Sequence, residues 1–109
     1  MSVNLPEPID RYFAADKTSD GDSVARCFTE DCVVKDEGNT YKGPGAVKKW
    51  KEDASSKYEY TCKPMAIDEK DDRIIVVCHL AGNFPGSPVD LRYAFQLESN
   101  KIKYLEITV

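Results

Sequence analysis

The stretch RIIVVCHLAGNFPGSPVDLRYAFQL, residues 73–97, decides the fold of this chain. Apolar side chains recur at every second position on both sides of the PGSP segment at 85–88, which is the spacing of strands with one buried face. A short connection rich in proline and glycine is typical of a hairpin. We therefore expect two antiparallel strands, residues 73–84 and 89–97, joined by this turn.

The same two-residue period continues beyond both ends of that stretch. Residues 58–67 and 101–109 also alternate between apolar and polar side chains. Only the polar segments 68–72 and 98–100 separate them from the central pair, and such short links favour antiparallel hairpins. The sequence thus predicts four consecutive strands in its second half.

The first half of the chain carries the spacing of helices instead. Residues 6–17 begin with a proline, which suits a first helical turn, and they place Ile9, Tyr12 and Phe13 on one face. A second, short helix is expected to follow, with Asp22 as its N-terminal cap. These two helices should cover part of the sheet.

A strand and a third helix complete the first half. Residues 32–36 form an apolar strand that ends in Asp36, and residues 37–40 form the turn that follows it. The third helix, residues 45–56, is amphipathic, with Trp50 on its apolar side and Lys51 among the charged residues of its polar side.

Helices first and strands afterwards predict an α+β fold in a single domain covering residues 1–109. We expect a cone in which three N-terminal helices pack on a strongly curved, mainly antiparallel sheet. The interior of such a cone is a natural site for a small apolar ligand.

Composition narrows the classes of partner. Hydrophobic residues make up 41% of the chain and charged residues 31%, and the net charge of -4 argues against binding of nucleic acid. The first residues lack the features of a secretion signal, and no apolar stretch is long enough to cross a membrane. We therefore expect a cytoplasmic protein with neither a membrane nor a nucleic acid as its partner.

The cysteines and the single histidine bear on cofactors. Four cysteines in a cytoplasmic protein are expected to stay reduced. Their irregular spacing, with His79 as the only histidine, argues against a metal site. The GPG segment at 43–45 lacks the lysine and hydroxyl residue of a phosphate-binding loop. No cofactor is expected.

Several segments carry a resemblance to a known family. They are RYFAA at 11–15, the Gly-Asp pair at 21–22, and FTED at 28–31, which leads to Asp36. Their order, with the four later strands, resembles the SnoaL-like and ketosteroid-isomerase-like branch of the nuclear transport factor 2-like superfamily. The resemblance covers nearly the whole chain. It implies the cone fold and a homodimer formed through the outer face of the sheet.

The resemblance also implies catalytic residues. In ketosteroid isomerases the positions matching Tyr12 and Asp36 hold an oxyanion donor and the catalytic base. A carboxylate in an apolar pocket can take a proton from carbon beside a carbonyl group, and a phenol can donate to the resulting enolate oxygen. The isomerases use a neutral carboxylic acid as a second donor. Here that position falls on Tyr93, and Asp90 lies on the opposite face of the sheet.

Each of these residues also has a purely structural interpretation. Tyr12 and Tyr93 can be core aromatics, and Asp36 can be a turn residue that binds local backbone N–H groups. His79 is expected on the outer face of the sheet, at the dimer interface rather than in catalysis. The ligand pocket is predicted to be lined by one helix residue and five strand residues: Trp50, Val76, Cys78, Leu80, Leu91 and Phe95.

Three functions remain open from the sequence. The first is a small cofactor-independent enzyme of the SnoaL-like kind, an isomerase or cyclase that transfers a proton on an apolar carbonyl compound with Asp36 as base. The second is a non-catalytic module that only binds a small ligand in the cone. The third is a dimerisation domain whose cone is filled by its own side chains.

Overall fold

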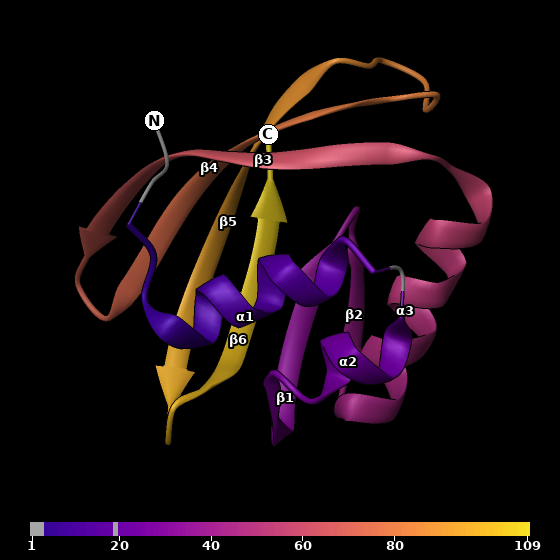
Figure 1. Ribbon diagram of the computed structural model, residues 1–109. Coiled ribbons are helices and arrows are strands. Elements are labelled where there is room, and N and C mark those ends of the chain that lie inside the picture. Colours follow the sequence, from indigo (N-terminus) through magenta and orange to yellow (C-terminus); the bar gives the residue numbers. More distant parts are fainter. Residues whose placement is uncertain (1–3, 19) are drawn as a thin grey trace.

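The computed structural model describes residues 4–18 and 20–109, which form helices packed against one bent sheet (Figure 1). The elements follow one another as α1 (Glu7–Asp16), α2 (Gly21–Ala25), β1 (Phe28–Asp36), β2 (Asn39–Lys42), α3 (Pro44–Lys57), β3 (Tyr60–Lys70), β4 (Arg73–Gly82), β5 (Val89–Glu98) and β6 (Lys101–Thr108). The predicted α+β class and the three helices are confirmed.

The sheet has six strands in the order β2-β1-β6-β5-β4-β3. Every neighbouring pair is antiparallel except β1 and β6, which run parallel. The four strands of the second half therefore form a continuous meander, and β1 joins its β6 edge. Figure 1 shows how strongly the sheet bends, because β3 runs at a steep angle to β1 and β6.

The sequence predicted only a turn where the structure has the short strand β2. The turn is confined to Glu37 and Gly38, both with positive φ (52° and 79°), which is the two-residue geometry that matches the twist of a hairpin. Residues 39–42 lie at the sheet edge with largely exposed side chains, so they lack the buried face that identifies a strand in a sequence. Strand β1 also begins earlier than predicted, at Phe28 rather than Cys32.

The short helix α2 is capped by Asp20, and the prediction of Asp22 as its cap was wrong. The Asp20 side chain accepts a hydrogen bond from the backbone N–H of Asp22 at 3.1 Å. Asp20 and Asp22 are both capping residue types, and the helix begins two residues earlier than expected. A side chain at Gly21 would lie 2.8 Å from the Lys48 carbonyl oxygen, so glycine allows α2 to approach α3 closely.

The core lies between the helices and the inner face of the sheet. Its largest fully buried side chains are aromatic or branched: Tyr12, Phe28, Phe95, Ile9, Ile102 and Leu105. The rings of Tyr12 and Phe95 meet edge to face with centroids 5.7 Å apart, a favourable aromatic geometry. Within the described residues, no helix combines the length and apolarity needed to cross a membrane.

Candidate functional site

Burial on the inner face of the sheet decreases towards one end. On β1, Val34 is fully buried, whereas Asp36 is partly exposed. On β6, Leu105 is fully buried, whereas Ile107 is partly exposed, and Leu91 on β5 continues the trend. We call this region the open end and define it by Asp36, Tyr41, Trp50, Leu91 and Ile107. The opposite region, around Phe95 and Tyr12, is called the closed end.

Asp36 is the acidic side chain at the open end, and Trp50 on α3 fixes its position. The indole Nε1–H of Trp50 donates a hydrogen bond to Asp36 Oδ2 at 3.1 Å. Burial raises the pKa of Asp36, and the bond from Trp50 only partly opposes this shift. A partly desolvated carboxylate with a raised pKa is a stronger base than an exposed one.

The strand register places Asp36 and Tyr93 in one row across the inner face. Ile107 on β6 pairs with Asp36 on one side and with Tyr93 on the other. Two strand spacings separate the two backbones, a distance of roughly 10 Å. The side chain that stands between the carboxylate and the phenol in this row is Ile107.

Tyr12 and Tyr93 lie in the core. Their side chains are 2% and 5% exposed, and their ring centroids are 6.5 Å apart. Burial raises the pKa of both phenols well above the ordinary value. Both therefore stay protonated and keep an O–H donor at physiological pH.

A cavity of about 500 Å³ opens between the end of α1, helix α3 and the start of β3. Asp16, Lys51, Tyr60 and Cys62 are among the residues that line it. Lys51 Nζ lies 2.6 Å from Asp16 Oδ1, and the two side chains are only 3% and 11% exposed. Burying two charges costs solvation energy, so a buried pair in a cavity wall marks a candidate functional site.

Tyr60 contacts the lysine of this ion pair and also experiences the charge of Asp36. Lys51 Nζ donates to the Tyr60 hydroxyl at 3.4 Å, and because an ammonium group only donates, the phenolic proton of Tyr60 remains free for a ligand. Burial raises the pKa of Tyr60, and the negative charges of Asp16 and Asp36 add to the shift. Tyr60 is thus a neutral donor within electrostatic reach of both carboxylates.

Cys62 joins the same cavity to the core. Its thiol lies 3.9 Å from the Tyr93 hydroxyl, and a hydrogen bond from the Cys78 thiol lowers the pKa of Cys62. All four cysteines of the chain are free thiols. Polar groups therefore run from the cavity towards the buried tyrosines.

The remaining predicted pocket residues divide between the two ends. Trp50 and Leu91 are partly exposed at the open end, and Leu80 is 8% exposed. Val76, Cys78 and Phe95 have no exposed surface and belong to the packed core.

His79 lies on the outer face, as predicted, because its neighbours Cys78 and Leu80 point inward and are buried. Its Nδ1 is 2.8 Å from Asp90 Oδ1 on the adjacent strand. This pair is exposed to solvent and faces away from the cone.

The sequence analysis missed Lys51 and its partners because it assigned the lysine to the polar side of its helix. Lys51 follows the buried Val47 by four residues, so the two side chains share one face of α3. That spacing could have identified the lysine as inward-facing. Its partner Asp16 is distant in sequence, and no local pattern predicts the pairing.

A sequence model of the SnoaL-like domain family matches residues 9–103. The chain resembles a candidate polyketide cyclase from Sinorhizobium meliloti, with 36% identity over 95% of both chains and a TM-score of 0.90. No curated protein sequence matches the chain.

Two further solved structures share the fold at lower identity. One is a Catenulispora acidiphila protein with a ketosteroid isomerase-like fold, in complex with trimethylamine (16% identity, 97% of this chain and 87% of that chain, TM-score 0.85). The other is SalBIII, an epoxide hydrolase/cyclase-like enzyme with a role in pyran ring formation in salinomycin (18% identity, 94% and 87%, TM-score 0.78).

Proposed function

The chain belongs to the SnoaL-like domain family, and from this membership we propose that it binds a small, largely apolar carbonyl compound and transfers a proton on it without a cofactor. The ligand would occupy the open end of the cone and the adjoining cavity. Asp36 would act as the base.

The observation that carries this proposal is the environment of Asp36. Its carboxylate is partly buried, has a raised pKa and accepts a hydrogen bond from the Trp50 indole. The neighbouring side chains at the open end, Leu91 and Ile107, are apolar and partly exposed. A base held beside apolar surface is suited to removing a proton from carbon.

The proposed chemistry is an enolisation. Asp36 takes a proton from the carbon beside the carbonyl group. The electron pair of the broken C–H bond forms a C=C bond, and the π pair of the C=O bond moves onto the carbonyl oxygen. A neutral phenol donates a hydrogen bond to this oxyanion. The protonated Asp36 can then return the proton to another carbon of the same ligand, so the reaction needs no outside reagent.

Three tyrosines are candidate donors to the oxyanion. Tyr60 lines the cavity and has a free phenolic proton, whereas Tyr12 and Tyr93 lie deeper. Individual Tyr→Phe substitutions separate them, since each removes one O–H and keeps the ring. Loss of one productive donor in such a site lowers turnover by about 100-fold or more.

The structural comparisons favour this class of ligand. The Sinorhizobium meliloti protein is described as a candidate polyketide cyclase, and SalBIII takes part in forming a pyran ring of a polyether. Polyketides contain many carbonyl groups with acidic neighbouring C–H bonds. Carbonyl compounds of this kind are therefore the first ligands to test.

The test is deuterium exchange into a panel of cyclic ketones in D₂O, followed by NMR. We expect the protein to accelerate loss of the α-proton signals of at least one ketone, and Asp36→Asn to slow that exchange by at least about 100-fold. The matched control is Asp68→Asn, which alters an exposed carboxylate on β3. Exchange that survives Asp36→Asn would contradict the proposed base.

A second candidate function is ligand binding without turnover. The observation that favours it is the complete burial of Val76, Cys78 and Phe95, which leaves no exposed surface on these predicted pocket residues. A small ligand would then meet only the open end and the cavity beside Tyr60. Saturable changes in Trp50 fluorescence without deuterium exchange would support this second function.

We further propose that two copies pair through the outer face of the sheet. Val33, Ile75, Val77, Ala94 and Tyr104 lie on that face and are partly exposed, and charged side chains lie among them: Arg73, Arg92 and Glu106. Val77→Glu places a further charge on this face and should convert a dimer to a monomer in analytical ultracentrifugation. A wild-type monomer at high micromolar concentration would contradict this pairing.

A further inference from the structure

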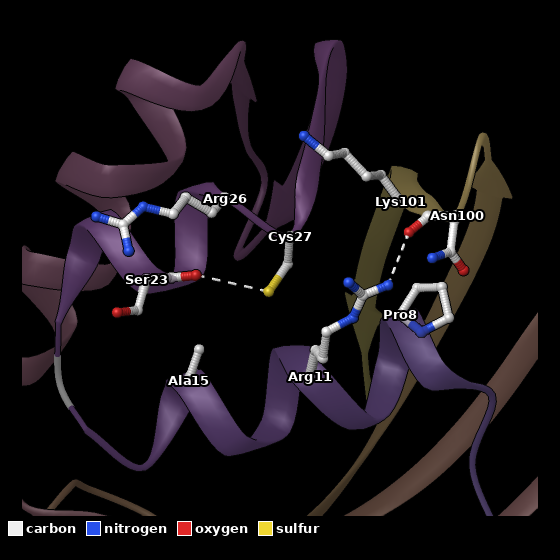
Figure 2. A pocket seen from close by; sticks show the side chains of 8 residues that line it. All are labelled: Pro8, Arg11, Ala15, Ser23, Arg26, Cys27, Asn100 and Lys101. Atoms are coloured by element: carbon white, nitrogen blue, oxygen red, sulfur yellow. Dashed lines mark hydrogen bonds between the residues drawn. The ribbon is translucent and has the colours of Figure 1, made fainter.

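A second cavity lies away from the cone, between α1, α2 and the turn that joins β5 to β6 (Figure 2). Its volume is about 230 Å³. Three of the eight residues that line it are cationic, Arg11, Arg26 and Lys101, and none of the eight is acidic. This lining contrasts with a chain whose net charge is -4.

Hydrogen bonds hold the walls of this cavity in place. Arg11 Nη2 donates to the Asn100 carbonyl oxygen at 3.1 Å. The backbone N–H of Ile102 donates to the Cys27 carbonyl oxygen at 2.8 Å, which ties the start of β6 to the end of α2. The three elements therefore present their side chains from fixed positions.

Arg11 and Lys101 are the two lining cations whose charges act on Cys27, a residue in the wall of the cavity. Figure 2 shows the Arg11 guanidinium and the Cys27 sulfur facing each other across it. The charges of Arg11 and Lys101 each act to lower the pKa of this thiol, although burial outweighs them and the net shift is upward. The thiol stays protonated, so it leaves these two positive charges uncompensated.

The acidic side chains that act on Arg11 and Arg26, Glu7 and Asp20, are not part of the cavity lining. Glu7 Oε1 is 3.9 Å from Arg11 Nη2, and both side chains are at least half exposed, so this ion pair is weak. Arg26 acts on the Asp20 carboxylate and extends along the rim in Figure 2. Arg11 and Lys101 thus share an influence on the Cys27 thiol, and neither is held by an acidic residue of the cavity lining.

We propose that this cavity binds a phosphate-type oxyanion between Arg11 and Lys101. A guanidinium group offers several N–H donors in one plane, and a lysine adds a mobile point charge, a combination suited to phosphate oxygens. This site is separate from the cone and does not depend on the proposed function.

The test is a titration of the ¹⁵N-labelled protein with inorganic phosphate at pH 7 and constant ionic strength, adjusted with sodium chloride. We expect saturable shifts of the backbone N–H signals of Cys27, Asn100 and Lys101, while the Trp50 indole signal stays in place. The affinity should fall at least tenfold in Arg11→Gln/Lys101→Gln. Because both cations are partly exposed, binding should also weaken as salt is raised.

Two variants keep this test decisive. Lys49→Gln/Lys63→Gln removes the same charge from two exposed lysines outside the cavity, and it should leave phosphate affinity unchanged. Lys101→Gln alone keeps the Arg11–Asn100 hydrogen bond and should still weaken binding. The proposal is overturned if the shifts do not saturate, or if both double variants lose affinity equally.

The source of the phosphate group is resolved by a second ligand. Glycerol 1-phosphate carries the same group on an organic stem, so an affinity at least tenfold above that of inorganic phosphate assigns the site to a phosphorylated metabolite. Equal affinities assign it to the free anion. Saturable binding of neither ligand contradicts the proposed site.

Discussion

The closed and open ends of the inner sheet face are built by the same strands but have opposite character. At the closed end, Tyr12 and Phe95 pack in a fully buried aromatic cluster. At the open end, the same strands present Asp36 and partly exposed apolar side chains. The closed end therefore supplies stability. This stability allows the open end to hold a partly desolvated carboxylate.

The largest expected effect is a difference in the free energy of unfolding between a variant of the closed end and a variant of the open end. Phe95→Ala removes a fully buried ring from the closed end and should lower the free energy of unfolding by about 3–5 kcal/mol. Leu91→Ala at the open end should cost less than half as much, because its side chain is already partly exposed. Urea denaturation of both variants measures this contrast. Equal losses would show that the two ends are packed alike.

The next effect concerns the buried ion pair beside the cavity. Lys51→Met leaves the Asp16 carboxylate without its partner at 2.6 Å, which should cost about 3 kcal/mol of stability. Asp16→Leu/Lys51→Met removes both charges and should recover most of that loss. Thermal unfolding of the single and double variants checks this. A double variant no more stable than the single one would contradict a specific pairing.

A smaller effect tests how Trp50 tunes Asp36. Trp50→Phe keeps an aromatic ring but removes the N–H that donates to Asp36 at 3.1 Å. That hydrogen bond favours the charged carboxylate, so its loss should raise the pKa of Asp36 further. The pH profile of ketone deuterium exchange should then shift to higher pH. An unchanged profile would show that the indole does not act on the base.

The smallest effect is on the pH dependence of stability. Since burial raises the pKa of Asp36, the folded protein holds this proton more tightly than the unfolded chain does. The resulting stabilisation is present below the ordinary pKa of 3.8 and is lost as pH rises through the raised value. Asp36→Asn does not titrate, so its Tm relative to wild type should increase over this window and then level off. Asp68→Asn is the matched control, and a difference that falls with pH would contradict the sign.

Most of the fold could be predicted from the sequence because it depends on local periodicity. The alternation in residues 73–97 and the helical spacing of Ile9, Tyr12 and Phe13 each identify one buried face. Strand β2 was missed because its four residues at the sheet edge have no such face. The cap of α2 was misplaced because Asp20 and Asp22 are equivalent by residue type.

A residue of the candidate site could be predicted only where its type contrasts with that of its neighbours in the sequence. Asp36 ends an apolar strand, and that contrast is visible in the sequence. The contact between Lys51 and Asp16 joins residues 35 positions apart, so it depends on how α1 and α3 pack. Which inner-face residues are exposed also depends on that packing, as the difference between Phe95 and Leu91 shows.

The most direct test of the open end is a pH titration of the Trp50 indole N–H signal by NMR. The chain has one tryptophan, so this signal is unambiguous, and its hydrogen bond to Asp36 makes it report ionisation of that carboxylate. The account predicts a titration midpoint above 3.8 in the wild type and no such titration in Asp36→Asn. A midpoint at or below 3.8, or one that persists in Asp36→Asn, would contradict a desolvated base at this position.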